Sequence, residues 1–128
     1  MFSKVLSFGL MGIKGFRIDV EVDTSVGLPS YDIVGLPDVA VKESKERVRS
    51  AIKNSGFNFP TKKITINLAP ASIKKVGPNF DLAIAVSILK STGQIKNIEN
   101  NFIIIGELGL DGQIKSVKGI LPALISAR

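Results

Sequence analysis

A short basic turn that leads into an apolar segment is the part of this sequence best suited to chemistry. The turn spans residues 75–81 with the sequence KVGPNFD, and residues 82–89 after it are almost entirely apolar. Such a turn presents one side chain and several backbone N–H groups at the start of a helix, where nucleophiles and anions are often found. The presented side chain is Asn79, and a carboxamide is not a nucleophile in ordinary hydrolysis. The turn therefore has the form of an active-site loop without its reactive group.

The absence of two residue types narrows the remaining chemistry. The chain contains neither His nor Cys, which excludes Ser-His-Asp and Cys-His catalysis and the commonest zinc ligands. A Ser–Lys or Thr–Lys pair remains, for example Ser72 with Lys74 or Lys75, and Lys118 is a further candidate base. Neither a fixed base nor an oxyanion hole is indicated for these residues. We therefore expect no catalytic, metal or cofactor site in this chain.

Length and composition indicate one globular domain over residues 1–128. Hydrophobic residues make up 45% of the chain and charged residues 22%, which is typical of a folded domain. No apolar run is long enough to span a membrane, and the first residues do not resemble a signal peptide. The lack of Cys favours an intracellular, cytoplasmic location.

The net charge of +6 is compatible with a polyanion such as DNA as partner, and equally with a merely basic surface. No aromatic residues alternate with the basic ones, so we do not expect a stacking platform for single strands. Alternatively, the basic residues around 42–53 form the solvated face of a helix, with pairs such as Glu43–Arg47, and the turn at residues 75–81 is a solvated loop. In that loop Asn79 would cap the following helix, while Asp81 would face the helix dipole or bond N–H groups of the turn. The candidate anion or DNA contacts are Lys42, Lys45, Arg49, Lys53, Lys62, Lys63, Lys74 and Lys75.

Hydrophobic periodicity predicts a sequence of strands and helices. Residues 15–23 alternate between apolar and polar, which is typical of a half-buried antiparallel strand, and Asp38 and Gly56 are placed to cap a helix between them. Because the last predicted helix is still running at residue 128, we expect the chain to be part of a longer protein. The predicted elements are a strand at 5–8 with a turn at Gly12, strands at 15–23, 31–34 and 63–68, helices at 39–55 and 80–91, a buried strand at 102–105, a hairpin at 108–114 with a type I′ turn at Asp111-Gly112, and a helix from Gly119. Together they predict an α+β domain with a mixed sheet and helices on one face.

Three sequence blocks stand out in this chain. They are residues 34–38 (VGLPD) followed by 41–44 (VKES), 66–71 (INLAPA) leading to the turn at 77–82, and 106–112 (GELGLDG). Together they resemble the N-terminal domain of the YifB/ComM family of magnesium-chelatase-like proteins. The resemblance implies a ribosomal-protein-S5-domain-2-like fold, similar to the proteolytic domain of Lon proteases. It also implies an accessory domain of a hexameric AAA+ ATPase that acts on DNA in branch migration, transformation and recombination. A Walker A motif is absent from these 128 residues, so ATP and Mg would be bound beyond residue 128.

The same resemblance assigns the two positions of a Lon-type Ser–Lys dyad. Asn79 stands where the serine belongs, and Leu121 stands where the lysine belongs. The implied function is a non-catalytic domain that packs against its own AAA+ module and neighbouring subunits, and contacts DNA. Two alternatives stay open at this point, a residual Ser–Lys peptidase and a stand-alone nucleic-acid-binding module.

Overall fold

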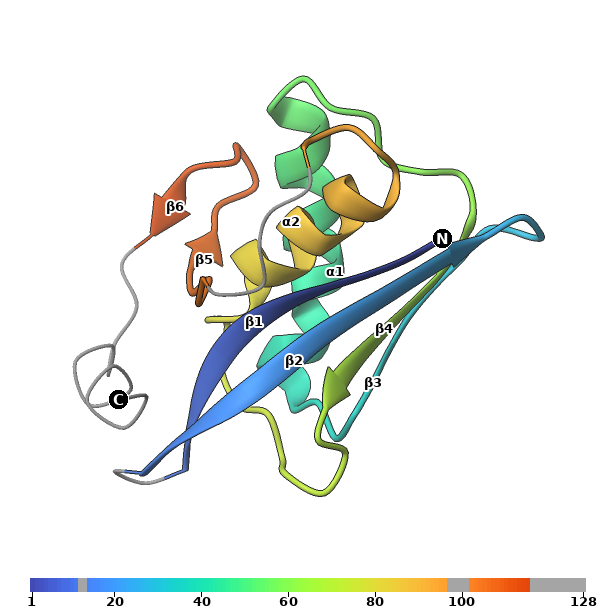
Figure 1. Ribbon diagram of the computed structural model, residues 1–128. Coiled ribbons are helices and arrows are strands. Elements are labelled where there is room, and N and C mark those ends of the chain that lie inside the picture. Colours follow the sequence, from blue (N-terminus) through green and yellow to red (C-terminus); the bar gives the residue numbers. More distant parts are fainter. Residues whose placement is uncertain (12–13, 97–101, 116–128) are drawn as a thin grey trace.

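A four-stranded mixed sheet forms the centre of the fold. The computed structural model describes residues 1–11, 14–96 and 102–115. The strands are β1 (Phe2–Met11), β2 (Lys14–Ser25), β3 (Ser30–Val34) and β4 (Lys63–Ala69), and they lie in the order β1-β2-β4-β3 (Figure 1). β2 pairs antiparallel with β1 and β4, and β3 pairs parallel with β4.

Two helices, α1 (Val39–Asn54) and α2 (Asp81–Ser91), cover one face of this sheet (Figure 1). The alternation predicted for β2 is confirmed, because Ile18, Val20 and Val22 are buried in the core that the sheet shares with the helices. The mixed sheet with two helices packed on it confirms the predicted α+β class. In the described part of the chain, neither helix is long and apolar enough to cross a membrane.

The ends of α1 follow their sequence signals. The Asp38 carboxylate accepts a hydrogen bond from the Val41 N–H at 2.8 Å, as an N-cap does. Such a cap typically contributes about 1 kcal/mol. At the other end Ser55 is the C-cap, and Gly56 follows with φ +87°, a conformation that favours glycine. Both predicted caps are confirmed.

The start of α2 differs from the prediction. Phe80 is the N-cap residue and makes no side-chain capping bond, so the predicted cap at Asn79 is wrong. The Asn79 side-chain amide instead donates to the carbonyl of Phe8 in β1 at 3.1 Å. The amide is therefore bonded to a main-chain carbonyl of the sheet and does not cap α2.

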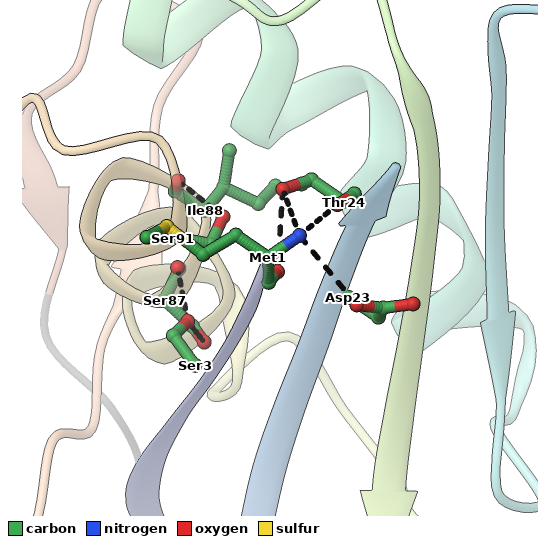
Figure 2. Close-up of polar contacts among 7 residues, drawn as sticks. All are labelled: Met1, Ser3, Asp23, Thr24, Ser87, Ile88 and Ser91. Atoms are coloured by element: carbon green, nitrogen blue, oxygen red, sulfur yellow. Dashed lines mark hydrogen bonds and ion pairs between the residues drawn. The ribbon is translucent and has the colours of Figure 1, made fainter. Parts of the chain in front are cut away.

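Hydroxyl groups connect β1 to α2 where the two elements pack together (Figure 2). The Ser3 hydroxyl donates to the Ser87 carbonyl at 2.6 Å and lies 2.9 Å from the Ser87 hydroxyl. The Ser91 hydroxyl donates to the Ile88 carbonyl within α2 at 2.9 Å. On the β2 side, the Met1 ammonium donates to the carbonyl of Thr24. The three serine bonds satisfy polar groups on a helix that is otherwise apolar, as burial requires.

The predicted buried strand at 102–105 is wrong. The segment meets β1 at a single bridge between Leu6 and Ile103, next to which the Ile104 N–H donates to the Leu6 carbonyl at 2.8 Å. Phe102 is 60% exposed and Ile103 is 40% exposed. The segment therefore touches the outer edge of β1 at one point and does not extend the sheet.

A small hairpin follows, formed by β5 (Glu107–Leu108) and β6 (Ile114–Lys115). The hairpin is confirmed, but its turn is not type I′. Asp111 does not share the positive φ of Gly112, and a type I′ turn requires positive φ at both central residues. The five residues between the paired strands exceed the two of such a turn. The predicted turn at Gly12 and the predicted helix from Gly119, with Leu121, lie outside the described residues.

Candidate anion-binding pocket and the turn at residues 75–81

The turn at residues 75–81 buries its lysine, Lys75. Lys75 is 1% exposed, and its ammonium donates to the carbonyl of Pro70. Its backbone N–H donates to the Leu36 carbonyl, and its own carbonyl accepts from the Asp38 N–H, both at 2.9 Å. Burial lowers the pKa of Lys75, because the charged ammonium is removed from water. The interpretation of residues 74–75 as a solvated loop is therefore wrong for Lys75, whose ammonium faces the protein interior.

The cavity beside this turn is nearly filled. It has a volume of about 10 Å³ and is lined by residues that include Gly9, Phe16, Lys75 and Phe80. That is room for about one water molecule. No serine is among the lining residues, and Ser72 lies on the exposed side of the loop. In the part of the chain that the structure describes, this cavity offers neither a serine beside a lysine nor space for a peptide.

Asp81, the last residue of the turn, joins three elements. Its carboxylate is fully buried and lies 2.6 Å from the Arg47 Nε and 3.1 Å from the Arg47 Nη2. The Leu108 N–H in β5 donates to the same carboxylate at 3.1 Å, and Arg47 also donates to the Ala40 carbonyl at 2.7 Å. We call Arg47, Asp81 and the Leu108 N–H the Asp81 cluster.

Two sequence predictions are corrected by the Asp81 cluster. Arg47 forms its ion pair with Asp81, so the proposed Arg47–Glu43 pair does not describe it. Asp81 does accept a backbone N–H bond, but from β5 and not from the turn. Burial raises the pKa of the Asp81 carboxyl, and the hydrogen bond from Arg47 opposes this rise. The same hydrogen bond raises the pKa of Arg47. The cluster is therefore a structural ion pair whose carboxylate depends on its guanidinium partner.

A second, larger pocket of about 250 Å³ lies between α1, the start of β3 and the connection before β4. Three of the predicted anion contacts, Arg49, Lys53 and Lys62, meet there with the rings of Tyr31 and Phe59. We call these five residues the cationic pocket. Its remaining lining residues are Pro29, Ser30, Pro60 and Thr61.

Aromatic rings accompany the charge in this pocket. The Arg49 guanidinium carbon lies 5.1 Å from the centre of the Phe59 ring and 5.8 Å from the centre of the Tyr31 ring. The two ring centres are 5.2 Å apart. No aromatic residue alternates with the basic ones in the sequence, and the fold brings these two rings to Arg49 from other segments than the helix that carries the charges. Whether they stack on a single strand stays a prediction. Cation–π contacts of this kind contribute about 0.5–2 kcal/mol.

Two polar atoms of the cationic pocket's residues are buried without a hydrogen-bond partner. They are the Arg49 Nε and the Tyr31 hydroxyl, as far as the described residues show. Burial raises the pKa of Tyr31, with the charge of Arg49 opposing this effect, so the hydroxyl keeps its proton at neutral pH. Both groups are thus donors that lack an acceptor.

The other predicted contacts do not join this pocket. Lys45 donates from its ammonium to the Tyr31 carbonyl at 2.9 Å, which connects α1 to β3. Lys42, Lys63 and Lys74 are exposed elsewhere, and Lys75 is buried at the turn. Three of the eight candidates therefore line the pocket, Lys45 lies beside its Tyr31 ring at 5.8 Å from the ring centre, and Lys75 is buried away from it.

Comparison with known proteins places this architecture in a family. Residues 20–128 match a family model described as subunit ChlI of Mg-chelatase. The chain belongs to the ChlI family. This confirms the resemblance to magnesium-chelatase-like proteins that the three sequence blocks carried.

Relatives of this ChlI-family chain are considerably longer. The chain is 42% identical over 125 residues to competence protein ComM of Haemophilus influenzae, covering 97% of this chain and 25% of that protein. It is 45% identical over 118 residues to the uncharacterized protein YifB of Escherichia coli, covering 91% and 23%. Similarity to Lon protease 2 of Bacillus subtilis is weaker, at 30% identity over 87 residues, covering 68% and 15%. The chain thus spans about a quarter of the length of ComM.

Proposed function

We propose that this ChlI-family chain is a non-catalytic accessory and assembly domain of a ComM-type AAA+ protein that acts in DNA processing. The observation that carries the proposal is the turn at residues 75–81. Its presented side chain, Asn79, is held by the Phe8 carbonyl, and the cavity beside it holds about one water molecule. A hydrolase would need a nucleophile, a fixed base and room for its substrate at this place.

The finer fold assignment is part of this proposal. The similarity to Lon protease 2 supports a ribosomal-protein-S5-domain-2-like domain related to the Lon proteolytic domain. The mixed sheet with helices on one face is compatible with that assignment. A fold retained without its reactive groups favours a role in packing or binding.

ATP and Mg belong, in this proposal, to a module outside these 128 residues, because the chain has no Walker A motif. The domain would pack against that module and against neighbouring subunits of a cytoplasmic homo-hexamer. Exposed apolar residues support such packing. Leu36, Val39 and Val76 are each more than half exposed, and the bridge between Pro37 and Lys75 places their segments side by side.

The backbone conformation of Leu36 supports the same packing role. Its φ of +55° lies in the left-handed region, which is uncommon for a leucine. An exposed, left-handed leucine is poorly explained by the stability of the isolated domain, and a contact with a partner explains it better.

A serine-reactive fluorophosphonate probe tests the absence of catalysis. We expect no serine of the folded chain to be labelled above the level of a heat-denatured sample. Ser72→Ala should leave this result unchanged. Specific labelling of one serine that disappears when that serine is replaced by Ala would overturn the proposal and favour the residual Ser–Lys peptidase.

A deletion tests the assembly role. In the ComM-type parent protein, removal of residues 1–128 should leave the ATP-binding module folded while weakening ring formation in sedimentation velocity. Unchanged assembly, with ATP present, would refute a packing function for this domain.

A further inference from the structure

We propose that the cationic pocket binds one nucleotide unit, with its phosphate held by Arg49, Lys53 and Lys62 and its base placed against Phe59. The inference deepens the proposed function and rests on it for the choice of DNA as the source of the nucleotide. A free nucleotide offers the same chemistry, and the experiment below separates the two sources.

Three positive charges meet in the pocket. Arg49 and Lys53 stand four residues apart in α1 and therefore share a helix face, while Lys62 reaches the pocket from the connection before β4. None of these three residues takes part in an ion pair of the described chain. Three neighbouring cations that form no ion pair repel each other, and a bound anion would relieve this repulsion.

The unpartnered donors point to the same kind of ligand. More than nine-tenths of buried polar groups in native proteins have a hydrogen-bond partner, yet the Arg49 Nε and the Tyr31 hydroxyl have none among the described residues. Tyr31 is 8% exposed and lines the pocket together with Arg49. A phosphate group supplies several acceptor oxygens and no obligatory donor, which complements a site made of donors.

The rings and the size of the pocket favour a nucleotide over simpler anions. Inorganic phosphate would use the charges but leave the Phe59 ring and the two prolines of the lining, Pro29 and Pro60, unused. An acidic peptide would do the same, because its carboxylates carry no flat ring. The volume of about 250 Å³ is just below the range of about 300–1,000 Å³ that is usual for small-molecule sites. That size is suited to one nucleotide unit and not to a longer stretch of strand.

Binding of a 5′-phosphorylated, fluorescein-labelled dT12 to the purified chain, measured by fluorescence anisotropy across a salt series, tests the inference. Lys53→Gln combined with Lys62→Gln removes two of the three pocket charges. We expect its Kd at low salt to rise about tenfold or more. Because the pocket holds a single phosphate, the slope of log K against log salt should fall by at most about 0.7, the contribution of one phosphate contact on a single strand.

The matched control is Lys96→Gln combined with Lys115→Gln, which removes the same charge from exposed positions outside the pocket. Its Kd should change by about twofold or less if the pocket is a discrete site. Equal losses in the two double variants would overturn the inference, because binding would then follow total charge alone. Absence of dT12 binding by the wild-type chain would overturn it as well.

The base contact is tested with Phe59→Leu, which keeps all charges. We expect its Kd to rise about fivefold or more, because stacking on an aromatic ring contributes about 1–3 kcal/mol per base. Phe59→Tyr, which keeps a ring, should bind as the wild type does, and circular dichroism checks that both variants fold. If both variants keep the affinity of the wild-type chain, the assigned base position is wrong.

Competition identifies the source of the nucleotide. Displacement of the labelled strand by millimolar dTMP supports a site for free nucleotides, whereas displacement by unlabelled dT12 alone supports a DNA strand. A poly-glutamate of equal length that competes as well as dT12 would overturn the inference. None of these results bears on the fluorophosphonate experiment, so failure of the pocket and failure of the non-catalytic function are distinguishable.

Discussion

Replacing Arg47 by Gln is the most direct test of the Asp81 cluster. The fully buried Asp81 carboxylate accepts two hydrogen bonds from Arg47 and one from the Leu108 N–H. The variant leaves a buried charge with only the last of these bonds. Removing one partner of a buried ion pair costs about 3–5 kcal/mol. Because the Arg47 side chain is 21% exposed, water can reach part of the site, and we expect a loss near 3 kcal/mol.

Urea unfolding followed by circular dichroism at pH 7 measures this loss. Arg17→Gln is the matched control, since Arg17 pairs with Asp19 at 3.2 Å while the two side chains are 63% and 29% exposed. An ion pair this exposed contributes about 1 kcal/mol or less. If Arg47→Gln costs no more than Arg17→Gln, the Asp81 cluster does not stabilise the fold.

The pH dependence of Arg47→Gln gives an independent check. Burial already raises the pKa of Asp81, and losing Arg47 removes the hydrogen bond that opposes this rise. A carboxyl group with a raised pKa in the folded state binds its proton more readily than in the unfolded chain. Its contribution to stability is thus fully present below the ordinary pKa of 3.8 and is lost as the pH rises through the folded value.

The stability deficit of Arg47→Gln should therefore shrink as the pH falls from 7 towards 4. The double variant with Asp81→Asn should recover part of the loss at pH 7, because it removes the buried charge. A deficit that is the same at both pH values would refute the assignment of the loss to the Asp81 carboxylate.

Three further changes can be measured with the same urea assay. Lys75→Met should stabilise the chain at pH 7 by about 1 kcal/mol or more, because it removes a buried charge. This gain should shrink as the pH approaches the ordinary lysine pKa of 10.5, because Lys75 in the folded wild-type chain loses its proton, and with it the cost of burial, at a lower pH than in the unfolded chain. A gain that is independent of pH would contradict the reasoning. Gly35→Ala should lower the free energy of unfolding by about 3 kcal/mol or more, because its Cβ would lie 2.3 Å from a β4 carbonyl oxygen at φ +104°. Gly56→Ala, with open space around it, should lower it by about 1 kcal/mol. Equal losses in the two variants would argue against the close approach at Gly35. Ser44→Ala should be neutral or stabilising by up to about 1 kcal/mol, because its buried hydroxyl has no partner among the described residues, and a clear loss would reveal a missing one.

The parts of the fold that the sequence predicts well are those with local signals. The alternation of residues 15–23 and the caps at Asp38 and Gly56 depend on neighbours within one strand or one helical turn, and the structure confirms them. Four apolar residues in a row predict a strand at 102–105, but such a run does not by itself distinguish a strand from an edge contact.

The features that sequence reasoning missed are contacts between distant segments. The partner of Arg47 is Asp81, and the rings beside Arg49 come from Tyr31 and Phe59. Helical spacing places Glu43 four residues before Arg47, so the sequence favours that pair. Only tertiary packing decides between Glu43 and Asp81. The sequence does not indicate the burial of Lys75 either, because a lysine in a glycine-containing turn is expected to be exposed to solvent. Unequal burial of neighbouring lysines appears only once the chain is folded.

The hydrogen bond from the Leu108 N–H to Asp81 has a consequence for local motion. A strand of only two residues would normally fray, and its amides would exchange with solvent within short times. Here, however, the Leu108 amide is released only when the carboxylate that orders α1 and α2 loses one of its three bonds. Breaking this bond requires only that the hairpin move away from α2, so the Leu108 amide should take up deuterium more slowly than the other amides of the hairpin, and its exchange reports the opening of the hairpin.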